Sequence, residues 1–152
     1  MNKFFISHRG NITGKNTSFE NNPDYIEDQV LPLYDCEVDL WFYDKKFFLG
    51  HDGLDYEVSE DWLIQHSLKL WIHCKNFESL NYFLTNKSNL NFFWHQEDRF
   101  TLTSKGFLWT YPGESYSNNS IIVDNTKELK NLSFLGICSD YVEFYYKNFK
   151  SI

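Results

Sequence analysis

The segment from Asp35 to Asp52 reads D-C-E-V-D-L-W-F-Y-D-K-K-F-F-L-G-H-D, and the fold is organised around it. Successive side chains of a β-strand point to opposite faces, so Glu37 and Asp39 share one face while Val38 lies on the other. Two carboxylates on one face repel each other, and a cation between them relieves that repulsion. An edge hairpin with a solvated acidic face explains the same pattern, so this segment alone leaves both interpretations open.

The second half of the segment predicts a hairpin. Residues 44–46 turn the chain, and residues 47–49 form an apolar run that returns toward Gly50 and His51. This arrangement would bring the His51 side chain near the carboxylate pair.

Length and composition limit what the chain can be. At 152 residues it is expected to form one domain over residues 1–152. Aromatic residues make up 20% of the chain, which suits a small protein that fills its core with few side chains. The net charge of −7 argues against nucleic acid as a partner, although a small phosphate ligand needs only a local positive site.

The cysteines and the apolar runs indicate the compartment. Cys36, Cys74 and Cys138 are an odd number without close pairing, so buried free thiols are expected rather than disulfides. The apolar run near the N-terminus is too short for the core of a signal peptide, and no apolar run reaches the length of a membrane span. We therefore expect a soluble, cytoplasmic protein without integral membrane association.

Short apolar runs separated by turn residues predict alternating strands and helices. The strands are expected at residues 3–8, 35–43, 47–49, 68–75, 91–95, 100–103, 106–111, 120–123 and 135–139. Helices are expected from Pro23 to Leu31, from the N-cap Ser59 to Ile64, over residues 77–84 and 127–132, and at the C-terminus.

Polar residues repeatedly follow these apolar runs, as parallel α/β sheets place their chemistry at the carboxyl ends of the strands. The polar clusters are His8-Arg9, His73 to Lys75, His95-Gln96, Asp124-Asn125 and Asp140. The predicted fold class is α/β, a compact TIM-like (β/α) barrel. Such barrels usually need ~200 residues or more, so several crossover helices must be shortened or missing, and some strand pairs must be antiparallel or irregular.

The ordered motifs resemble a known family. His8-Arg9-Gly10, Glu20-Asn21, Glu37-x-Asp39 and His51-Asp52 resemble the H-R-G, E-N-T, E-x-D and H-D signature of glycerophosphodiester phosphodiesterases. Residues 121–129 and 136–141 are similar to the family's closing W-T-V-N-D and G-I-I-T-D-Y-P segments. The similarity covers the first third and the last fifth of the chain, in the family's order and in a much shortened form.

The resemblance implies a TIM-barrel fold of the phospholipase-C-like superfamily and a metal-dependent phosphodiesterase activity. It implies one divalent cation, held by Glu37 and Asp39 with Glu20 at or near it. By the same resemblance His8 and His51 would be the catalytic acid–base pair. Arg9 would hold a phosphate oxygen, and Lys75 corresponds to the lysine of the family's E-x-K strand.

Two positions depart from the family pattern. His73 stands where the family has a glutamate that is a third metal ligand, and Asn22 stands where it has the threonine of E-N-T. The resemblance favours Mg²⁺ or Ca²⁺, whereas an imidazole favours Mn²⁺ or Zn²⁺. Three alternatives therefore remain: the metal preference has changed, His73 binds substrate and the metal is held more weakly, or the metal is lost.

Three further residues are candidates for the pocket lining. His95 lies at a strand end, where a pocket role and a structural role are equally consistent with the sequence. Trp109 and Tyr111 share a strand face, and they could stack on a substrate or pack in the core.

Two functions from different classes follow. The first is hydrolysis of a small glycerophosphodiester-like or phospholipid-derived substrate. The second is a catalytically degenerate barrel that binds a phosphorylated ligand or a protein partner. Because missing helices would leave apolar barrel surface, a homo-oligomer that covers this surface is a further expectation.

Overall fold

Seven parallel strands form the centre of one curled sheet in the computed structural model, which describes residues 3–128 and 133–149. The order of the parallel strands is β6-β5-β2-β1-β10-β9-β8, and antiparallel strands extend the sheet. The strands are β1 (Phe4–His8), β2 (Asp35–Tyr43), β3 (Lys46–Leu49), β4 (Tyr56–Val58), β5 (Leu70–Cys74), β6 (Phe92–Trp94), β7 (Phe100–Leu102), β8 (Leu108–Thr110), β9 (Ser120–Val123) and β10 (Gly136–Ser139).

The long strand β2 has two different halves. Its first half lies between β1 and β5, with Glu37 opposite His8 and Asp39 opposite His73. Its second half continues beyond these neighbours and pairs with β3 in an antiparallel hairpin, to which β4 adds a third strand. The carboxylate pair therefore lies in the middle of the sheet, and the solvated edge hairpin considered from the sequence is not what forms.

The inner face of the curl is packed with large apolar side chains toward the amino ends of the strands. Aromatic rings dominate this cluster, and Trp71 lies 5.8 Å from Trp109, which in turn stacks on Phe93 at 4.8 Å between ring centroids. The buried members are Ile6, Trp71, Phe93, Trp109, Ile121 and Cys138. This packing leaves the space above it, at the carboxyl ends, for polar side chains.

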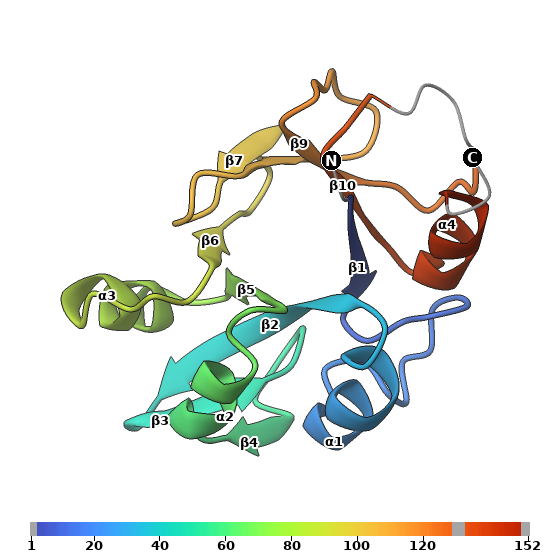
Figure 1. The fold of residues 1–152 in the computed structure, drawn as a ribbon. Coiled ribbons are helices and arrows are strands. Elements are labelled where there is room, and N and C mark those ends of the chain that lie inside the picture. The colour runs from blue at the N-terminus through green and yellow to red at the C-terminus, as the bar shows by residue number, and fades with distance from the viewer. Residues whose placement is uncertain (1–2, 129–132, 150–152) are drawn as a thin grey trace.

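Helices cover part of the outer face. They are α1 (Pro23–Tyr25) with the continuous π-helical segment η1 (Ile26–Val30), α2 (Glu60–Gln65), α3 (Phe77–Thr85) and α4 (Val142–Phe149). Ser59 caps α2 as expected, because its hydroxyl accepts a hydrogen bond from the Trp62 backbone N–H at 3.1 Å. Figure 1 shows the strands following one another around a curve with these helices outside it.

The described residues include no helix between β8 and β9, which agrees with the expected loss of crossover helices. A mixed α/β fold with a curled sheet is confirmed, whereas β6 and β7 are not paired as strands. Hydrogen bonds nevertheless cross this gap, from the Ser104 backbone N–H to the Phe92 carbonyl at 2.7 Å and from the Thr101 hydroxyl to the Trp94 carbonyl at 2.9 Å.

Some local predictions need correction or fall outside the description. Strand β4 was not predicted, because its three residues carry too short a pattern to recognise. Lys127 and Glu128 are not helical, and the rest of the helix expected over residues 127–132 lies outside the described residues. Cys36, Cys74 and Cys138 are buried free thiols, as expected. Over the described ranges, none of the helices has the length and hydropathy needed to cross a membrane.

Candidate functional site

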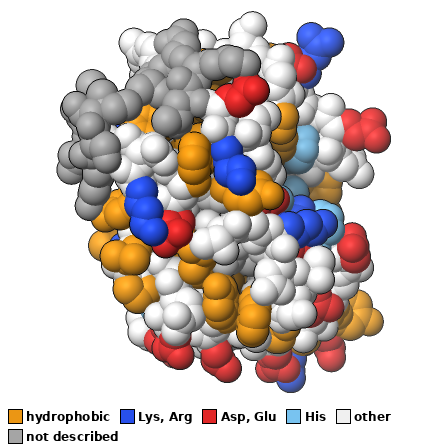
Figure 2. Space-filling view, turned by 90° about the vertical axis from the view of Figure 1, so that its right-hand side faces the viewer, with side chains coloured by type: hydrophobic (Ala, Val, Ile, Leu, Met, Phe, Trp, Pro, Cys, Tyr) orange, Lys and Arg blue, Asp and Glu red, His pale blue; other side chains and the backbone are white. Residues whose placement is uncertain are grey.

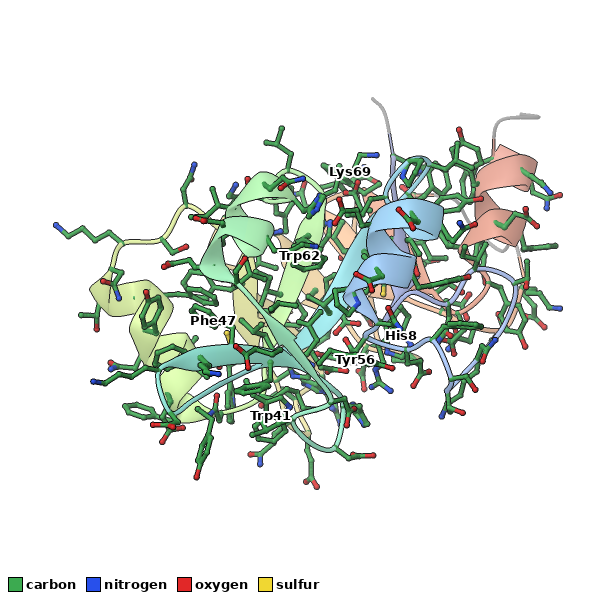
Figure 3. All side chains as sticks on the ribbon, turned by 90° about the horizontal axis from the view of Figure 1, so that it is seen from below. His8, Trp41, Phe47, Tyr56, Trp62 and Lys69 are labelled. Atoms are coloured by element: carbon green, nitrogen blue, oxygen red, sulfur yellow. The ribbon has the colours of Figure 1, made fainter. Side chains whose placement is uncertain are left out.

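The candidate site lies at the carboxyl ends of the central parallel strands. His8 is the last residue of β1, and Lys69 comes directly before β5. In Figure 3 Lys69 lies near the top of the view, and His8 and Trp41 lie below it. Polar residues at the ends of β1, β5 and β6 meet here, because His8, Arg9, Lys75 and His95 line one cavity.

Glu37 and Asp39 are buried next to each other on β2. Their exposed fractions are 3% and 0%. Burial and the negative charge of Asp39 raise the pKa of Glu37. Burial alone would raise the pKa of Asp39 too, but the close approach of His51 and His73 and the charge of Arg9 outweigh it, so the pKa of Asp39 is held well below its ordinary value.

The two oxygens of Asp39 have different surroundings. Oδ2 accepts a hydrogen bond from Asn21 Nδ2 at 3.0 Å, and it lies 3.0 Å from Arg9 Nε and 3.3 Å from His51 Nδ1. Oδ1 accepts no hydrogen bond, and Oε2 of Glu37 accepts none either. Buried carboxylate oxygens without a hydrogen bond are costly unless a positive charge faces them.

His73 supplies a nitrogen to the same place. Its Nδ1 lies 3.1 Å from Asp39 Oδ1 and 3.8 Å from Glu37 Oε1. Glu37, Asp39 and His73 together form a group whose ligand atoms all lie within 4.8 Å of one another. These three side chains could hold a metal ion.

His8 is oriented by Asp140, the residue directly after the neighbouring strand β10. Its Nδ1 lies 2.7 Å from Asp140 Oδ1, and its Nε2 lies 4.0 Å from Glu37 Oε2. Burial lowers the pKa of His8, but the hydrogen bond with Asp140 and the charge of Glu37 outweigh this effect and raise it. Burial raises the pKa of Asp140, and the hydrogen bond and charge of His8 overcome it, so the pKa of Asp140 is lowered.

His51 reaches the site from the loop after β3. Its Nδ1 lies 3.3 Å from Asp39 Oδ2 and 3.4 Å from Lys75 Nζ. Lys75 Nζ also lies 3.6 Å from Asp39 Oδ1. The structure thus brings together the residues predicted from the hairpin and from the end of β5.

Glu20 lies beside the site but outside the group around Asp39. Its Oε1 accepts a hydrogen bond from Asn11 Nδ2 at 2.8 Å, and its Oε2 lies 3.9 Å from Arg9 Nη1. These contacts make Glu20 a partner of Arg9, and it is not one of the three residues that share the candidate metal position.

A cavity of about 270 Å³ opens above these side chains. The residues that line it include His8, Arg9, Glu37, His51, His73, Lys75, His95, Trp109 and Tyr111. Figure 2 shows histidine side chains next to Lys or Arg side chains near the right-hand edge of the face it draws.

The three expected lining residues differ in position. Trp109 is 2% exposed and belongs to the aromatic layer beneath the cavity, so it packs in the core and also forms the cavity floor. The rings of His95 and Tyr111 stack with centroids 3.5 Å apart and form one wall. Burial, with a smaller contribution from the neighbouring His73, lowers the pKa of His95 to about 4, so the His95 ring is neutral at pH 7.

Sequence reasoning missed the asparagines that support the site. The Asn21 side chain donates to the Asp39 carboxylate and accepts from the Asp39 backbone N–H. The side chains of Asn11 and Asn125 donate to Asp140 at 2.8 and 2.9 Å. The only signal in the sequence was the position of Asn21 in the Glu20-Asn21 motif and of Asn125 directly after a predicted strand.

A second hollow of about 350 Å³ lies near α4 and holds none of the expected catalytic or metal-binding residues. Its lining is mainly apolar and includes Ile122, Phe134, Ile137 and Phe149. The position of titratable groups, rather than the size of the hollow, therefore identifies the candidate site.

Comparisons with models of protein families, with curated proteins and with solved structures found no match for this chain.

Proposed function

We propose that this chain is a metal-dependent phosphodiester hydrolase acting on a small glycerophosphodiester-like or phospholipid-derived substrate. The observation that carries the proposal is a buried carboxylate pair, of which Glu37 lines a cavity together with four histidines, an arginine and a lysine. Its motifs resemble those of glycerophosphodiester phosphodiesterases, and the curled sheet with a packed interior supports a shortened TIM-like barrel.

The residues present fit a divalent cation. Asp39 Oδ1 and Glu37 Oε2 are buried without a hydrogen bond, so a metal would satisfy oxygens that protein groups leave open. Glu37 and Asp39 would hold the ion, and the ion would draw charge from a non-bridging phosphate oxygen.

The remaining residues bind and orient a phosphodiester. The Arg9 and Lys75 side chains place positive charge at the cavity, where they would attract the phosphate anion and stabilise the charge that develops on its oxygens. A volume of about 270 Å³ suits a small head group rather than a polymer.

The two histidines supply the proton transfers. With its Nδ1–H directed to Asp140, His8 presents Nε2 to the cavity, while His51 Nδ1 lies 3.3 Å from Asp39 Oδ2 and 3.4 Å from Lys75 Nζ. One histidine takes the proton of the attacking hydroxyl, which belongs to water or to the substrate itself, and the other protonates the leaving alkoxide. Each transfer contributes ~10²–10⁴-fold to the rate.

The proposal is tested with purified chain, a panel of glycerophosphodiesters and a panel of divalent cations, with products followed by phosphorus NMR. We expect cation-dependent hydrolysis, and we expect His8→Ala and His51→Ala each to lower kcat/KM at least ~100-fold.

His66→Ala is the matched control, because His66 contacts Glu27 and Trp62 away from the cavity. This variant should keep its activity, and thermal unfolding should show that all three variants are folded. Activity that survives exhaustive chelation and both catalytic substitutions would contradict the proposal.

One observation favours a second candidate, a degenerate barrel that binds a phosphorylated ligand or a protein without turnover. Asp39 already has Arg9, His51, His73 and Lys75 around it, so positive groups of the protein could compensate the pair without a metal. In that case neither hydrolysis nor thermal stabilisation by any divalent cation would be observed.

A further inference from the structure

The Nδ1 atom of His73 faces two carboxylates, and its tautomer decides what that contact means. The other ring nitrogen, Nε2, lies 3.1 Å from the backbone carbonyl oxygen of His95. A carbonyl accepts a hydrogen bond and cannot donate one, so Nε2 carries a proton. In the neutral imidazole the lone pair is then on Nδ1, the ring nitrogen that lies 3.1 Å from Asp39 Oδ1.

A lone pair that faces carboxylate oxygens is repulsive unless a cation lies between them. Nδ1 is 3.1 Å from Asp39 Oδ1, yet this oxygen accepts no hydrogen bond, so closeness here does not mean a bonded pair. The alternative is an imidazolium with protons on both nitrogens, which would form an ion pair with Asp39.

The distances agree with a shared cation. Two ligand atoms that are each about 2.1 Å from a metal ion lie about 3.0 Å apart at a right angle and about 4.2 Å apart when opposite. The distances from His73 Nδ1, 3.1 Å to Asp39 Oδ1 and 3.8 Å to Glu37 Oε1, fall inside this range, so Oε1 is the oxygen of Glu37 that would share the ion with His73.

The surroundings also hold each ligand in place. Asn21, Arg9 and His51 surround Oδ2 of Asp39, while Oδ1 accepts no hydrogen bond and has Lys75 Nζ 3.6 Å away. The His73 ring stacks on Phe93, with centroids 5.3 Å apart and planes 3° from parallel. A backbone carbonyl that accepts from the far ring nitrogen is one of the partners that orient histidine ligands in metal sites.

Resting on the metal site of the proposed function, we propose that His73 Nδ1 is the third protein ligand of that cation. The His95 carbonyl fixes the imidazole in its metal-binding tautomer, and the site therefore selects cations of the manganese and zinc class over magnesium or calcium. An imidazole ligand suits the later divalent metals, while magnesium and calcium prefer sites made of oxygen atoms alone.

The first experiment measures binding of Mn²⁺, Zn²⁺, Mg²⁺ and Ca²⁺ to the metal-stripped full chain by calorimetry. We expect Mn²⁺ and Zn²⁺ to bind at least about 10-fold more tightly than Mg²⁺. His73→Gln should weaken Mn²⁺ binding at least about 10-fold, because loss of supporting groups alone costs that much in metal sites. His73→Glu should shift the Mn²⁺ to Mg²⁺ ratio by about 10-fold toward Mg²⁺, and His66→Gln should change neither.

The second experiment observes the ring directly, without any substrate. Nitrogen NMR of the histidine side chains should show the Nε2–H tautomer of His73 before metal addition and a shifted Nδ1 signal with Zn²⁺. Pulsed EPR of the Mn²⁺-loaded chain should show a directly bound nitrogen that disappears in His73→Gln.

Several outcomes would overturn the inference: a His73 ring protonated at both nitrogens, equal Mn²⁺ affinity in His73→Gln and wild type, or no cation binding at all. The inference and the proposed function fail separately. Metal binding as expected without diester hydrolysis would reject the proposed function and leave His73 as a metal ligand. Diester hydrolysis with a metal preference that His73→Glu does not change would reject His73 as a ligand and leave the proposed function.

Discussion

At the scale of single residues, Asp39 shows how a buried charge is kept in this protein. The side chain is completely buried, and it remains ionised because Arg9, Asn21 and His51 approach one of its oxygens. Arg9 and Asn21 come from the loop after β1 and His51 comes from the loop after β3, so the charge of Asp39 depends on both loops being in place.

Asp140 is a second carboxylate that polar partners keep charged, so it tests the effect of such partners outside the pair of Glu37 and Asp39. Its oxygens accept hydrogen bonds from Asn11 and Asn125 and contact His8 Nδ1. Asp140→Asn replaces one accepting oxygen by an NH2 group, which cannot accept a hydrogen bond from Asn11, Asn125 or His8. We therefore expect a loss of about 1–3 kcal/mol in the free energy of unfolding near neutral pH. Urea unfolding of both proteins would measure it.

The loss should depend on pH in a defined direction. The pKa of Asp140 is lowered in the folded state, so its stabilisation is present above about pH 4 and disappears as the pH falls through the folded value. The pKa of His8 is raised, so its stabilisation is full below about pH 6.5 and disappears as the pH rises through the folded value. The difference between wild type and Asp140→Asn should therefore be largest between about pH 4 and 6.5.

The exposed Asp28 provides the control, since Asp28→Asn should give a small difference that is flat across this range. A difference for Asp140→Asn that does not change with pH would contradict the assigned ion pair.

At the scale of elements, the hairpin β2–β3 positions His51. The loop after β3 folds closely, and the carbonyl of Gly50 accepts a hydrogen bond from Trp41 Nε1 at 2.7 Å. A Cβ atom at position 50 would lie 2.1 Å from the Gly53 carbonyl oxygen, which is far inside van der Waals contact.

Gly50→Ala should therefore move the loop, take His51 away from Asp39, and destabilise the protein by about 1–3 kcal/mol. The His51 side-chain NMR signals and urea unfolding measure the two effects. Gly53→Ala is the matched control in the same loop, because its Cβ would meet only Asp55 Oδ1 at 4.0 Å. Unchanged His51 signals in Gly50→Ala would refute the role given to the loop.

At the scale of the whole molecule, the gap between β6 and β7 decides how far the sheet closes on itself. Ser104 spans this gap, since its hydroxyl accepts from the Phe92 backbone N–H at 3.0 Å and donates to the Leu90 carbonyl at 3.0 Å. Its backbone N–H reaches the Phe92 carbonyl as well.

Ser104→Ala leaves the Phe92 N–H and the Leu90 carbonyl without these partners, and we expect a loss of about 1–3 kcal/mol in the free energy of unfolding. Hydrogen exchange at Phe92 and Trp94 should quicken more than exchange in β1. Ser18→Ala, at an exposed loop position, should change neither. An equal increase in hydrogen exchange in β1 and β6 of Ser104→Ala would contradict the role of Ser104 in holding β6 locally.

The expected homo-oligomer also belongs to this scale, and it stays a prediction. Phe100 and Leu102 on β7 are 42% and 65% exposed, so this part of the outer face is apolar. Light scattering of the purified chain would measure its mass in solution.

The sequence by itself determined the order of the elements and the chemistry at their ends. The apolar runs and the polar residues that follow them are local patterns, and period-2 alternation assigned Glu37 and Asp39 to one face of a strand. The strands and the main helices could therefore be predicted, whereas β4 was too short for its pattern to be read.

Only the tertiary structure decided which of these residues meet. The register of β2 against β5 places Asp39 opposite His73, and the end of β6 brings the His95 carbonyl to the far side of the His73 ring. Likewise β10 lies beside β1 and so gives His8 its partner Asp140. Such pairings join residues that are distant in sequence. They depend on strand register and on the direction of hydrogen bonds, and both exist only once the strands have assembled into the curled sheet.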